Sequence, residues 1–245
     1  MTVLGQSLNG PLIIMTMHQG KLIVLEGTDG SGKGTQQALL AKRLIAEGLS
    51  VETISFPQYG TKSCGPVEEY LNGGYGALKE VSPYIASLLY MIDRFGARKK
   101  IQQWLDAGLF VLSDRYSTSN MGHQGAQIQD PEARKQFWDW LHIMEFDVFA
   151  NPRPDMVFIL HIPFDVSLQL IEQKKQRSYI TGGKKKDLLE SDTEHLRLAE
   201  QAYLEIARSE QNAVLIECAP NGVLLDIETI HDILYARVKN LFSDE

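Results

Sequence analysis

The chain has 245 residues, of which 44% are hydrophobic, and this length and composition fit one large α/β domain better than two separate cores. Its 31 acidic and 24 basic residues give a net charge of −7, which argues against a general nucleic-acid binder because such proteins need a basic face. The longest apolar runs have about 4 to 7 residues, far short of the roughly 20 that a helix needs to cross a bilayer. We therefore expect neither a nucleic-acid polymer nor a membrane as a partner.

Two cysteines, Cys64 and Cys218, lie far apart in the sequence and match no metal-binding or disulfide spacing. Reduced thiols are typical of a cytoplasmic protein, and we expect this location. Residues 1–19 lack both a basic segment before their apolar stretch and a small-residue cleavage site after it, so no signal peptide is predicted. We interpret them as a disordered extension or a start assigned too early, since Met15 and Met17 lie just before the first expected strand.

Strands and helices alternate along the rest of the chain. Short apolar runs predict strands at 21–26, 50–56, 109–114, 155–162 and 213–217. Helical periodicity predicts helices at 34–48, 83–107, 131–149, 164–176, 191–210 and 223–242. We expect loops in a Gly/Pro-broken segment that ends near residue 80, in a polar stretch with Gly122 and Gly125, and in a basic stretch over 177–187. Nearly continuous apolar strands between helices indicate a five-stranded parallel sheet covered on both faces, within one domain over 20–245.

The first strand is followed by a glycine-rich motif. "EGTDGSGKGTQ" contains G-x-x-x-x-G-K from Gly27 to Lys33, between a strand and a helix, as a phosphate loop requires. Its glycines permit the tight turn that points backbone N–H groups and the positive end of the helix dipole at phosphate oxygens. Lys33 adds a charge that can reach the β- and γ-phosphates of ATP. The expected ATP-binding residues are Gly27, Gly30, Ser31, Gly32, Lys33, Gly34 and Thr35.

Two residues are candidates for a Mg²⁺ ion that accompanies ATP. Gly34 replaces the Ser or Thr that usually follows the lysine, so Thr35 is the hydroxyl that would meet the metal, if any does so directly. Asp114 ends the third strand, where an acid beside a phosphate loop can hold Mg²⁺ directly or through water. Arg115 would then point at the phosphates, and a surface ion pair is the alternative interpretation.

The chain resembles the thymidylate kinases over about residues 20–240, and five segments that occur in order carry the resemblance. These segments are "EGTDGSGKGTQ", "FPQYG" (56–60), "LLYMIDRF" (88–95), "SDRYSTSNMGHQG" (113–125) and "PRPDMVFILHIP" (152–163). The resemblance implies a three-layer P-loop NTPase fold with a short lid. It also implies ATP-dependent phosphorylation of dTMP to dTDP by in-line transfer, in dTTP synthesis, by a homodimer.

The resemblance also assigns an acceptor site. Tyr90 takes the place of the aromatic that stacks on thymine, although ordinary core packing is the alternative. Arg94 lies four residues further on the same helix face and corresponds to an arginine that donates to the base carbonyl. Asp29 corresponds to an acid that binds the sugar 3′-hydroxyl, and a solvated loop residue is the alternative. The other expected contacts come from Phe56 and Pro57 as walls, from Ser119 and Gln124 at the base edge, and from Arg115 as the clamp on the acceptor phosphate.

Three positions depart from the family pattern. Tyr59 and Gly60 stand where an arginine usually contacts the acceptor phosphate, and Lys62 is a candidate substitute. His123 stands where a Tyr or Phe commonly lies near the sugar 2′-carbon, which weakens the inference that ribonucleotides are excluded. Gly30 stands where some members carry an arginine, which predicts that the catalytic arginines lie in the lid.

The expected lid covers about 174–190. Phosphoryl transfer spreads charge over the equatorial oxygens of the moving group, so a cation must approach and water must leave. Arg177 is the main candidate for that cation, which makes the expected catalytic set Lys33, Arg115, Arg177 and Asp29. The further lid candidates are Lys184, Lys185, Lys186 and Arg197 as cations and Gly182 and Gly183 as a hinge, with a solvated basic loop as the alternative. The adenine site is expected at 219–223.

Two other functions stay open at this stage. One is a kinase of another nucleoside monophosphate such as dUMP, because a pocket distinguishes one methyl group by only about 1–3 kcal/mol. The other is a P-loop nucleotide switch without phosphotransfer. Against the switch stand a lid cation and an acceptor pocket, represented by Arg177, Tyr90, Arg94 and Gln124.

Overall fold

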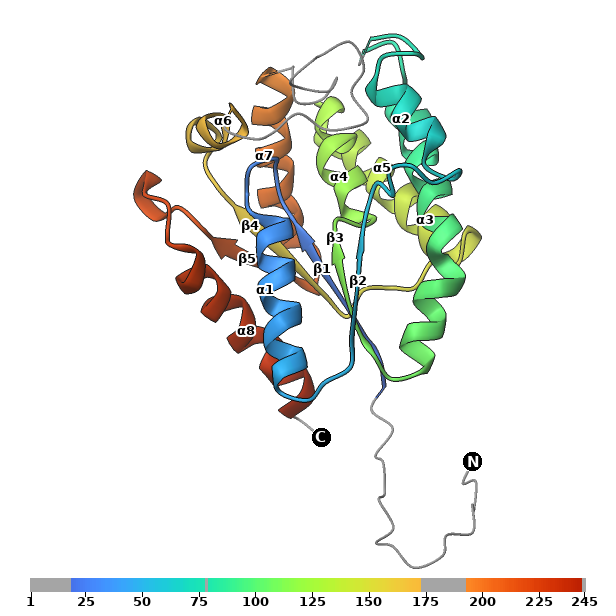
Figure 1. Ribbon diagram of the computed structural model, residues 1–245. Coiled ribbons are helices and arrows are strands. Elements are labelled where there is room, and N and C mark those ends of the chain that lie inside the picture. The colour runs from blue at the N-terminus through green and yellow to red at the C-terminus, as the bar shows by residue number, and fades with distance from the viewer. Residues whose placement is uncertain (1–18, 78, 173–192, 244–245) are drawn as a thin grey trace, which may run out of the picture.

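The computed structural model describes residues 19–77, 79–172 and 193–243. These residues contain an entirely parallel five-stranded sheet with the strand order β2-β3-β1-β4-β5 (Figure 1). The strands are β1 (Lys21–Glu26), β2 (Val51–Ser55), β3 (Phe110–Asp114), β4 (Met156–His161) and β5 (Ala213–Glu217). The α/β fold is therefore confirmed, and all five predicted strands are confirmed to within one residue at each end.

Strand β1 lies in the middle of the sheet, between β3 and β4. Leu25 pairs with Asp114 of β3, and Glu26 pairs with Ile159 of β4, so the three strands end at the same edge. The chain changes direction across the sheet at this point, because β2 and β3 lie on one side of β1 and β4 and β5 on the other. In open parallel sheets, ligands bind beside such a switch point, at the carboxyl ends of the strands.

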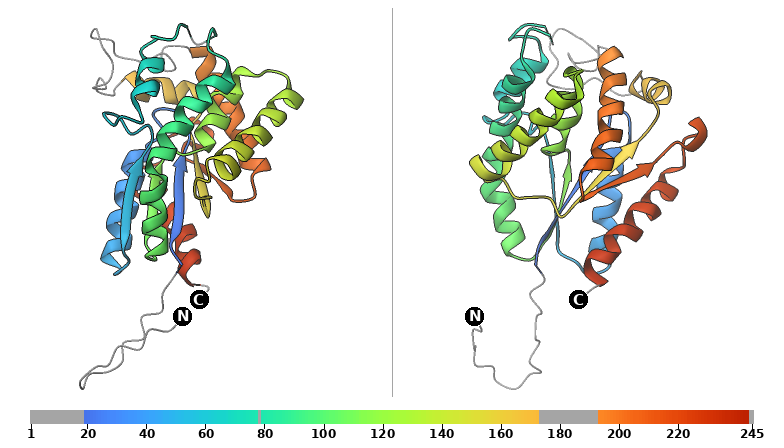
Figure 2. Two further views of the ribbon diagram at one scale, coloured as in Figure 1. Left: turned by 90° about the vertical axis from the view of Figure 1, so that its right-hand side faces the viewer. Right: turned by 180° about the vertical axis from the view of Figure 1, so that it is seen from behind.

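Both faces of the sheet are buried under helices (Figures 1 and 2). Alternate residues of β1 point to opposite sides: Leu22 and Val24 join one hydrophobic cluster, and Ile23 and Leu25 join the other. The second cluster includes side chains of α1 (Lys33–Ala46) and α8 (Ile227–Ser243). The first cluster includes side chains of α3 (Pro83–Asp106), α5 (Pro131–His142) and α7 (Thr193–Ser209).

Two helices occur where the sequence predicts loops. Helix α2 (Gly65–Leu71) begins with a proline in its first turn, where no backbone N–H is needed, and it buries Val67 and Tyr70. Helix α4 (Thr118–His123) contains Gly122. A Cβ at Gly122 would lie 2.6 Å from the ring of Tyr203 on α7. This glycine therefore permits close packing of α4 on α7, and the loop predicted around it is wrong.

Several predicted helices have different ends in the structure. The helix predicted over 131–149 changes at Ile143–Val148 into a π-helical turn. Helix α8 begins four residues later than predicted, because Pro220–Gly222 forms a 3₁₀ turn with Asn221 at a φ of 56°. Helix α6 (Phe164–Glu172) follows β4. The predicted end of that helix, the expected lid with Arg177 and Lys184 to Lys186, and residues 1–18 lie outside the described residues.

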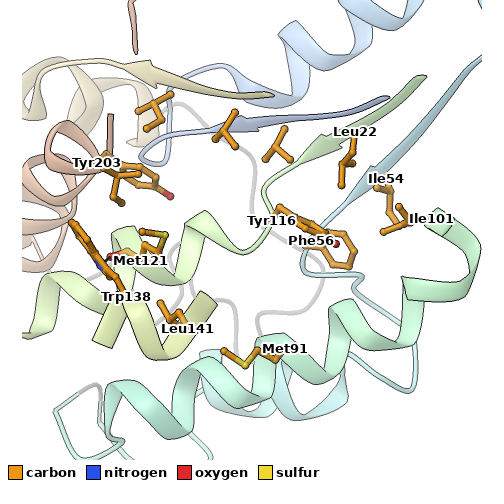
Figure 3. Close-up of a cluster of buried hydrophobic side chains, with 14 of the residues drawn as sticks. Leu22, Ile54, Phe56, Met91, Ile101, Tyr116, Met121, Trp138, Leu141 and Tyr203 are labelled. Carbon is orange, nitrogen blue, oxygen red and sulfur yellow. Dashed lines mark hydrogen bonds between the residues drawn. The ribbon is translucent and has the colours of Figure 1, made fainter. Parts of the chain in front are cut away.

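A cluster of aromatic and aliphatic side chains fixes the β3–α4 connection (Figure 3). The ring of Tyr116 meets that of Phe56 edge-on, with 5.7 Å between their centroids, and the Tyr116 hydroxyl donates to the Pro152 carbonyl at 3.1 Å. On α5, Trp138 Nε1 donates to the Met121 carbonyl at 3.1 Å. The residues on both sides of this connection are therefore held by packing as well as by hydrogen bonds.

Within residues 19–77, 79–172 and 193–243, no helix combines the length and the apolar character that crossing a bilayer demands.

Candidate active site

Two adjoining cavities open at the carboxyl edge of the sheet. The first, with an empty volume of about 890 Å³, is lined by the glycine-rich loop and by Asp114. The second, of about 480 Å³, is lined by residues of α3 and α4. The cavities share part of their walls, so ligands in the two would face each other. The shared residues are Asp29, Phe56, Pro57, Tyr59 and Arg115.

The glycine-rich loop wraps around the side chain of Lys33. Lys33 is 6% exposed, and its Nζ donates to the carbonyls of Gly27 at 3.1 Å and Thr28 at 2.9 Å. Gly27 has a φ of 133°, and a Cβ there would lie 2.4 Å from the Leu160 carbonyl oxygen, so no larger residue fits. Five of the seven predicted ATP-binding residues line the first cavity, namely Gly30, Gly32, Lys33, Gly34 and Thr35, whereas Gly27 and Ser31 do not line it.

The oxygen atoms near Asp114 suit a hard divalent cation. Asp114 Oδ1 is buried and has no hydrogen-bond partner among the described residues, and Thr35 lines the same cavity. A Cβ on Gly34 would lie 3.3 Å from Asp114 Oδ2, so the position after Lys33 faces this carboxylate. In the described part of the chain, no three His, Cys, Asp or Glu side chains are grouped to hold a metal by themselves. One carboxylate plus ligand phosphates is a common arrangement for Mg²⁺, so these residues fit the ion.

Arg115 and Asp29 form an ion pair where the cavities meet. Arg115 Nη2 donates to Asp29 Oδ1 at 2.7 Å, and Nη1 donates to the Gly27 carbonyl at 3.2 Å. Burial opposes the charge of Arg115, but Asp29, together with Tyr203, Glu26 and Asp114, outweighs it, and the pKa of this guanidinium is raised well above its usual value. The two side chains are 15% and 8% exposed, so neither the surface ion pair nor the solvated loop acid describes them. Charge is therefore concentrated where two phosphates would meet.

A chain of hydrogen bonds orients the amides at the inner end of the second cavity. Buried Arg94 donates from Nε to Glu145 at 2.8 Å and from Nη2 to Asn120 Oδ1. A guanidinium can only donate, so Asn120 Nδ2 faces Gln124 and donates to its Oε1 at 2.8 Å. Gln124 Nε2 is buried and has no hydrogen-bond partner among the described residues. Gln124, which is expected at the base edge, lines the second cavity and has its Oε1 already occupied, so it is left chiefly as a donor.

The remaining predicted site residues within the described chain divide into two groups. Tyr90, Arg94 and Ser119 line the second cavity, together with the shared Phe56 and Pro57. Three other candidates line neither cavity: Lys62, residues 219–223 and Arg197, which donates to Glu194 on its own helix at 2.5 Å. The proposed substitution of Lys62 for the missing arginine therefore has no support in the geometry.

Two polar residues of the site are missed by sequence reasoning. Asn120 lines the second cavity directly after the predicted Ser119. Glu26 is fully buried and accepts hydrogen bonds from the Tyr116 N–H at 2.8 Å, Ser119 Oγ at 2.7 Å and Tyr203 Oη at 3.0 Å. Burial raises the pKa of its carboxyl group, although Arg115 opposes this. An acid at the end of an apolar strand, directly before a phosphate loop, is the signal that could have identified Glu26.

Comparisons with known proteins point to one family. The sequence model of the family described as thymidylate kinase matches residues 25–225. A thymidylate kinase of Mycobacterium tuberculosis is 32% identical over 187 residues, which cover 76% of this chain and 85% of that protein. A probable thymidylate kinase of Thermococcus kodakarensis is 30% identical over 227 residues, which cover 91% and 99%. A solved thymidylate kinase structure from Candida albicans superposes with a TM-score of 0.69 at 22% identity, covering 91% of this chain and 92% of that one. This last likeness concerns the fold alone.

Proposed function

The chain belongs to the thymidylate kinase family, and we propose that its two adjoining cavities bind ATP and dTMP so that the phosphates of the two nucleotides meet beside Arg115. The enzyme phosphorylates dTMP to dTDP at the expense of ATP. The observation that carries the assignment of the cavities is their shared wall, in which Arg115 and Asp29 lie between the phosphate loop and the acceptor cavity. Neither a different monophosphate as the main substrate nor a switch without phosphotransfer is favoured by this family membership.

Catalysis by this arrangement rests on positioning and charge. The acceptor phosphate of dTMP is already ionised near neutral pH, so no general base is required for in-line attack on the γ-phosphorus. Lys33 would leave the loop carbonyls to bind the β- and γ-phosphate oxygens, and Arg115 would hold the acceptor phosphate. We assign the cation that neutralises the moving group to Arg177 from the sequence.

Asp114 and Thr35, which both line the first cavity, would hold a Mg²⁺ ion bound with ATP. When bound, it supplies neutralisation of the charge that develops on the β- and γ-phosphate oxygens. The orphaned buried oxygen of Asp114 is what supports this site. Gly34 keeps the space in front of that carboxylate open, because a side chain at this position would approach Asp114 Oδ2.

An assay of ATP consumption against a panel of monophosphates tests the function. We expect dTMP to be the best acceptor and dUMP to be weaker by about 10- to 200-fold, since the two differ by one methyl group. For dCMP we expect a kcat/KM at least about 100-fold below that of dTMP, because its amino group would meet the Gln124 Nε2 donor and leave it unpaired. Absence of ATP consumption with every pyrimidine monophosphate would refute the assignment.

The variant Gln124→Leu removes the hydrogen-bond donor of residue 124 but keeps a side chain of similar size, so it tests the donor apart from the shape of the cavity. It should lower kcat/KM for dTMP while leaving kcat/KM for dCMP nearly unchanged. The ratio of the two kcat/KM values should therefore fall. Gln127→Leu is the matched control, because Gln127 Nε2 is also buried without a partner in the described residues but lines neither cavity. If the ratio of kcat/KM for dTMP to kcat/KM for dCMP were the same in the wild type and in both variants, Gln124 would not select the base.

We further propose a homodimer that forms through α3. Ile85, Ile92 and Phe95 are 53%, 43% and 48% exposed, and their spacing places them along one face of this helix. Large exposed apolar stripes on a monomer indicate an interaction surface. Ile92→Lys should therefore shift the protein from dimer to monomer in sedimentation velocity, with an unchanged circular dichroism spectrum. A monomeric wild-type protein at micromolar concentration would contradict the proposal.

A cytoplasmic location also stays a proposal. Cys64 and Cys218 are both free and buried. Burial raises the pKa of each thiol to about 12, so both stay protonated near neutral pH. Unreactive reduced thiols suit a reducing compartment.

A further inference from the structure

Two histidines continue the hydrogen-bond network of Arg115, and the first of them, His123, also lines the second cavity. His123 Nε2 lies 3.2 Å from Arg115 Nη1, and His123 Nδ1 lies 3.4 Å from His195 Nε2. His123 belongs to α4, and His195 belongs to the first turns of α7. The two imidazole rings are stacked with 5.6 Å between their centroids, and both residues are buried.

The donor properties of Arg115 determine where the protons of this chain lie. A guanidinium has no acceptor, so His123 Nε2 must be unprotonated and must accept the hydrogen bond from Nη1. The proton of a neutral His123 is then on Nδ1, from which it is donated to His195 Nε2. His195 must accept there, so its own proton is also on Nδ1. Both rings are therefore neutral, and both adopt the same tautomer.

The surroundings of His123 hold it in this neutral form. Burial lowers its pKa well below the usual value, and the charges of Arg115 and Lys33 and the neighbouring His195 act in the same direction. Asp29 acts against them. Tyr203 on α7, whose hydroxyl donates to Glu26, also faces the ring. An imidazole that stays neutral offers Arg115 a permanent acceptor without adding charge beside the phosphates.

We propose that His123 and His195 are positioning residues that fix the guanidinium of Arg115 for the acceptor phosphate, through the chain His195–His123–Arg115. Asp29 fixes Nη2, and His123 fixes Nη1 together with the Gly27 carbonyl, so the plane of the guanidinium is held from both sides. Among the described residues, no hydrogen bond involves the Nε of Arg115, so that edge stays available to a phosphate. The inference rests on the proposed role of Arg115.

Kinetics of matched variants test the positioning role. His123→Phe keeps a flat ring that can stack on His195 but removes the acceptor, and it should raise KM for dTMP about tenfold or more while KM for ATP changes less than threefold. His123→Gln supplies an amide oxygen to Arg115 and should recover most of that loss. His231→Gln is the control, since His231 is a buried histidine on α8 that lines neither cavity. Equal KM values for dTMP in the Phe and Gln variants would overturn the proposal.

The second histidine is tested by coupling. His195→Phe should raise KM for dTMP in the same direction as His123→Phe, and the double variant should be no worse than His123→Phe alone, because both changes interrupt one chain. Effects that multiply in the double variant would show that the residues act separately. Arg115→Ala distinguishes failure of the proposed function from failure of this inference. If Arg115→Ala leaves the dTMP kinetics unchanged, Arg115 does not hold the acceptor phosphate. If only the histidine variants leave the dTMP kinetics unchanged, the chain His195–His123–Arg115 is refuted and the role of Arg115 stands.

The tautomers supply a readout that a purely structural role would not produce. In protein labelled with ¹⁵N-histidine, long-range ¹H–¹⁵N correlation spectra should show His123 and His195 protonated on Nδ1 and unprotonated on Nε2 at neutral pH. The signals are assigned by their loss in His123→Gln and His195→Phe. Observation of His123 protonated on Nε2 would contradict the chain even if the kinetic effects were as expected.

Discussion

Replacing Lys33 by alanine is expected to lower kcat by about 10²–10³-fold or more, the scale on which loss of one preorganised group at developing charge affects an enzyme. Lys33 is buried at the start of α1, and its Nζ contacts the loop carbonyls of Gly27 and Thr28. A triphosphate can replace these weak hydrogen bonds to neutral carbonyl oxygens with much stronger hydrogen bonds to charged phosphate oxygens. Rapid-quench measurement of dTDP formation at saturating ATP would give the change in the transfer step.

Lys42→Ala is the matched control for this prediction. Lys42 lies on the same helix but is exposed to solvent, so its removal should leave both kcat and the KM for ATP unchanged. Both variants should melt at temperatures close to that of the wild type. A Lys33→Ala protein with a normal melt and nearly normal turnover would show that the loop does not hold the transferred phosphate.

The parts of this protein that could be predicted from the sequence are those specified by neighbouring residues. The strand "KLIVLE" is apolar at both alternating sets of positions because both of its faces are buried, and this is visible in six letters. The phosphate loop could be predicted for the same reason, since its glycines and Lys33 follow one another in the chain. The prediction that Asp114 lies beside the phosphate loop requires one further assumption, that β3 pairs with β1. The structure confirms this pairing.

The parts that could not be predicted depend on contacts between distant segments. Arg94 binds Glu145, which lies 51 residues away, and Glu26 accepts a hydrogen bond from Tyr203, which lies 177 residues away. Neither partner carries a motif of its own. The same reason explains the error at α4: a glycine in a polar stretch predicts a loop, although here the ring of Tyr203 requires a glycine at position 122. Single-sequence patterns contain no information on which side chain will pack there.

The backbone of Arg115 points to a site under constraint. Arg115 has a φ of 67°, in the left-handed region that side chains with a Cβ seldom adopt, and the Arg115 N–H donates to the Leu25 carbonyl at 2.9 Å. Such conformations persist where the surrounding structure determines them, often at active sites. Here the cluster around Tyr116 and Phe56 holds the connection, so the side chain of Arg115 leaves the end of β3 in a fixed direction.

Arg115→Ala is expected to raise KM for dTMP and to lower kcat, with a combined loss in kcat/KM of about 10³-fold or more, because a charged clamp on a phosphate in a water-excluded site is removed. The variant also removes the ion pair between Arg115 and the buried Asp29. We therefore expect a lower melting temperature as well, and dTMP binding by calorimetry should be compared at a temperature where the variant is folded.

Three further proteins separate the causes of that loss. Arg115→Lys keeps the charge but not the planar fork, so it should fall between the wild type and the alanine variant. Arg115→Gly relieves the positive φ, and it should be as inactive as the alanine variant but more stable. Arg134→Ala removes another paired arginine, which donates to Glu205 at 2.8 Å and lines neither cavity, and its kinetics should match the wild type. If Arg134→Ala and Arg115→Ala had the same effect on dTMP kinetics, the loss would reflect general destabilisation and Arg115 would not be the clamp.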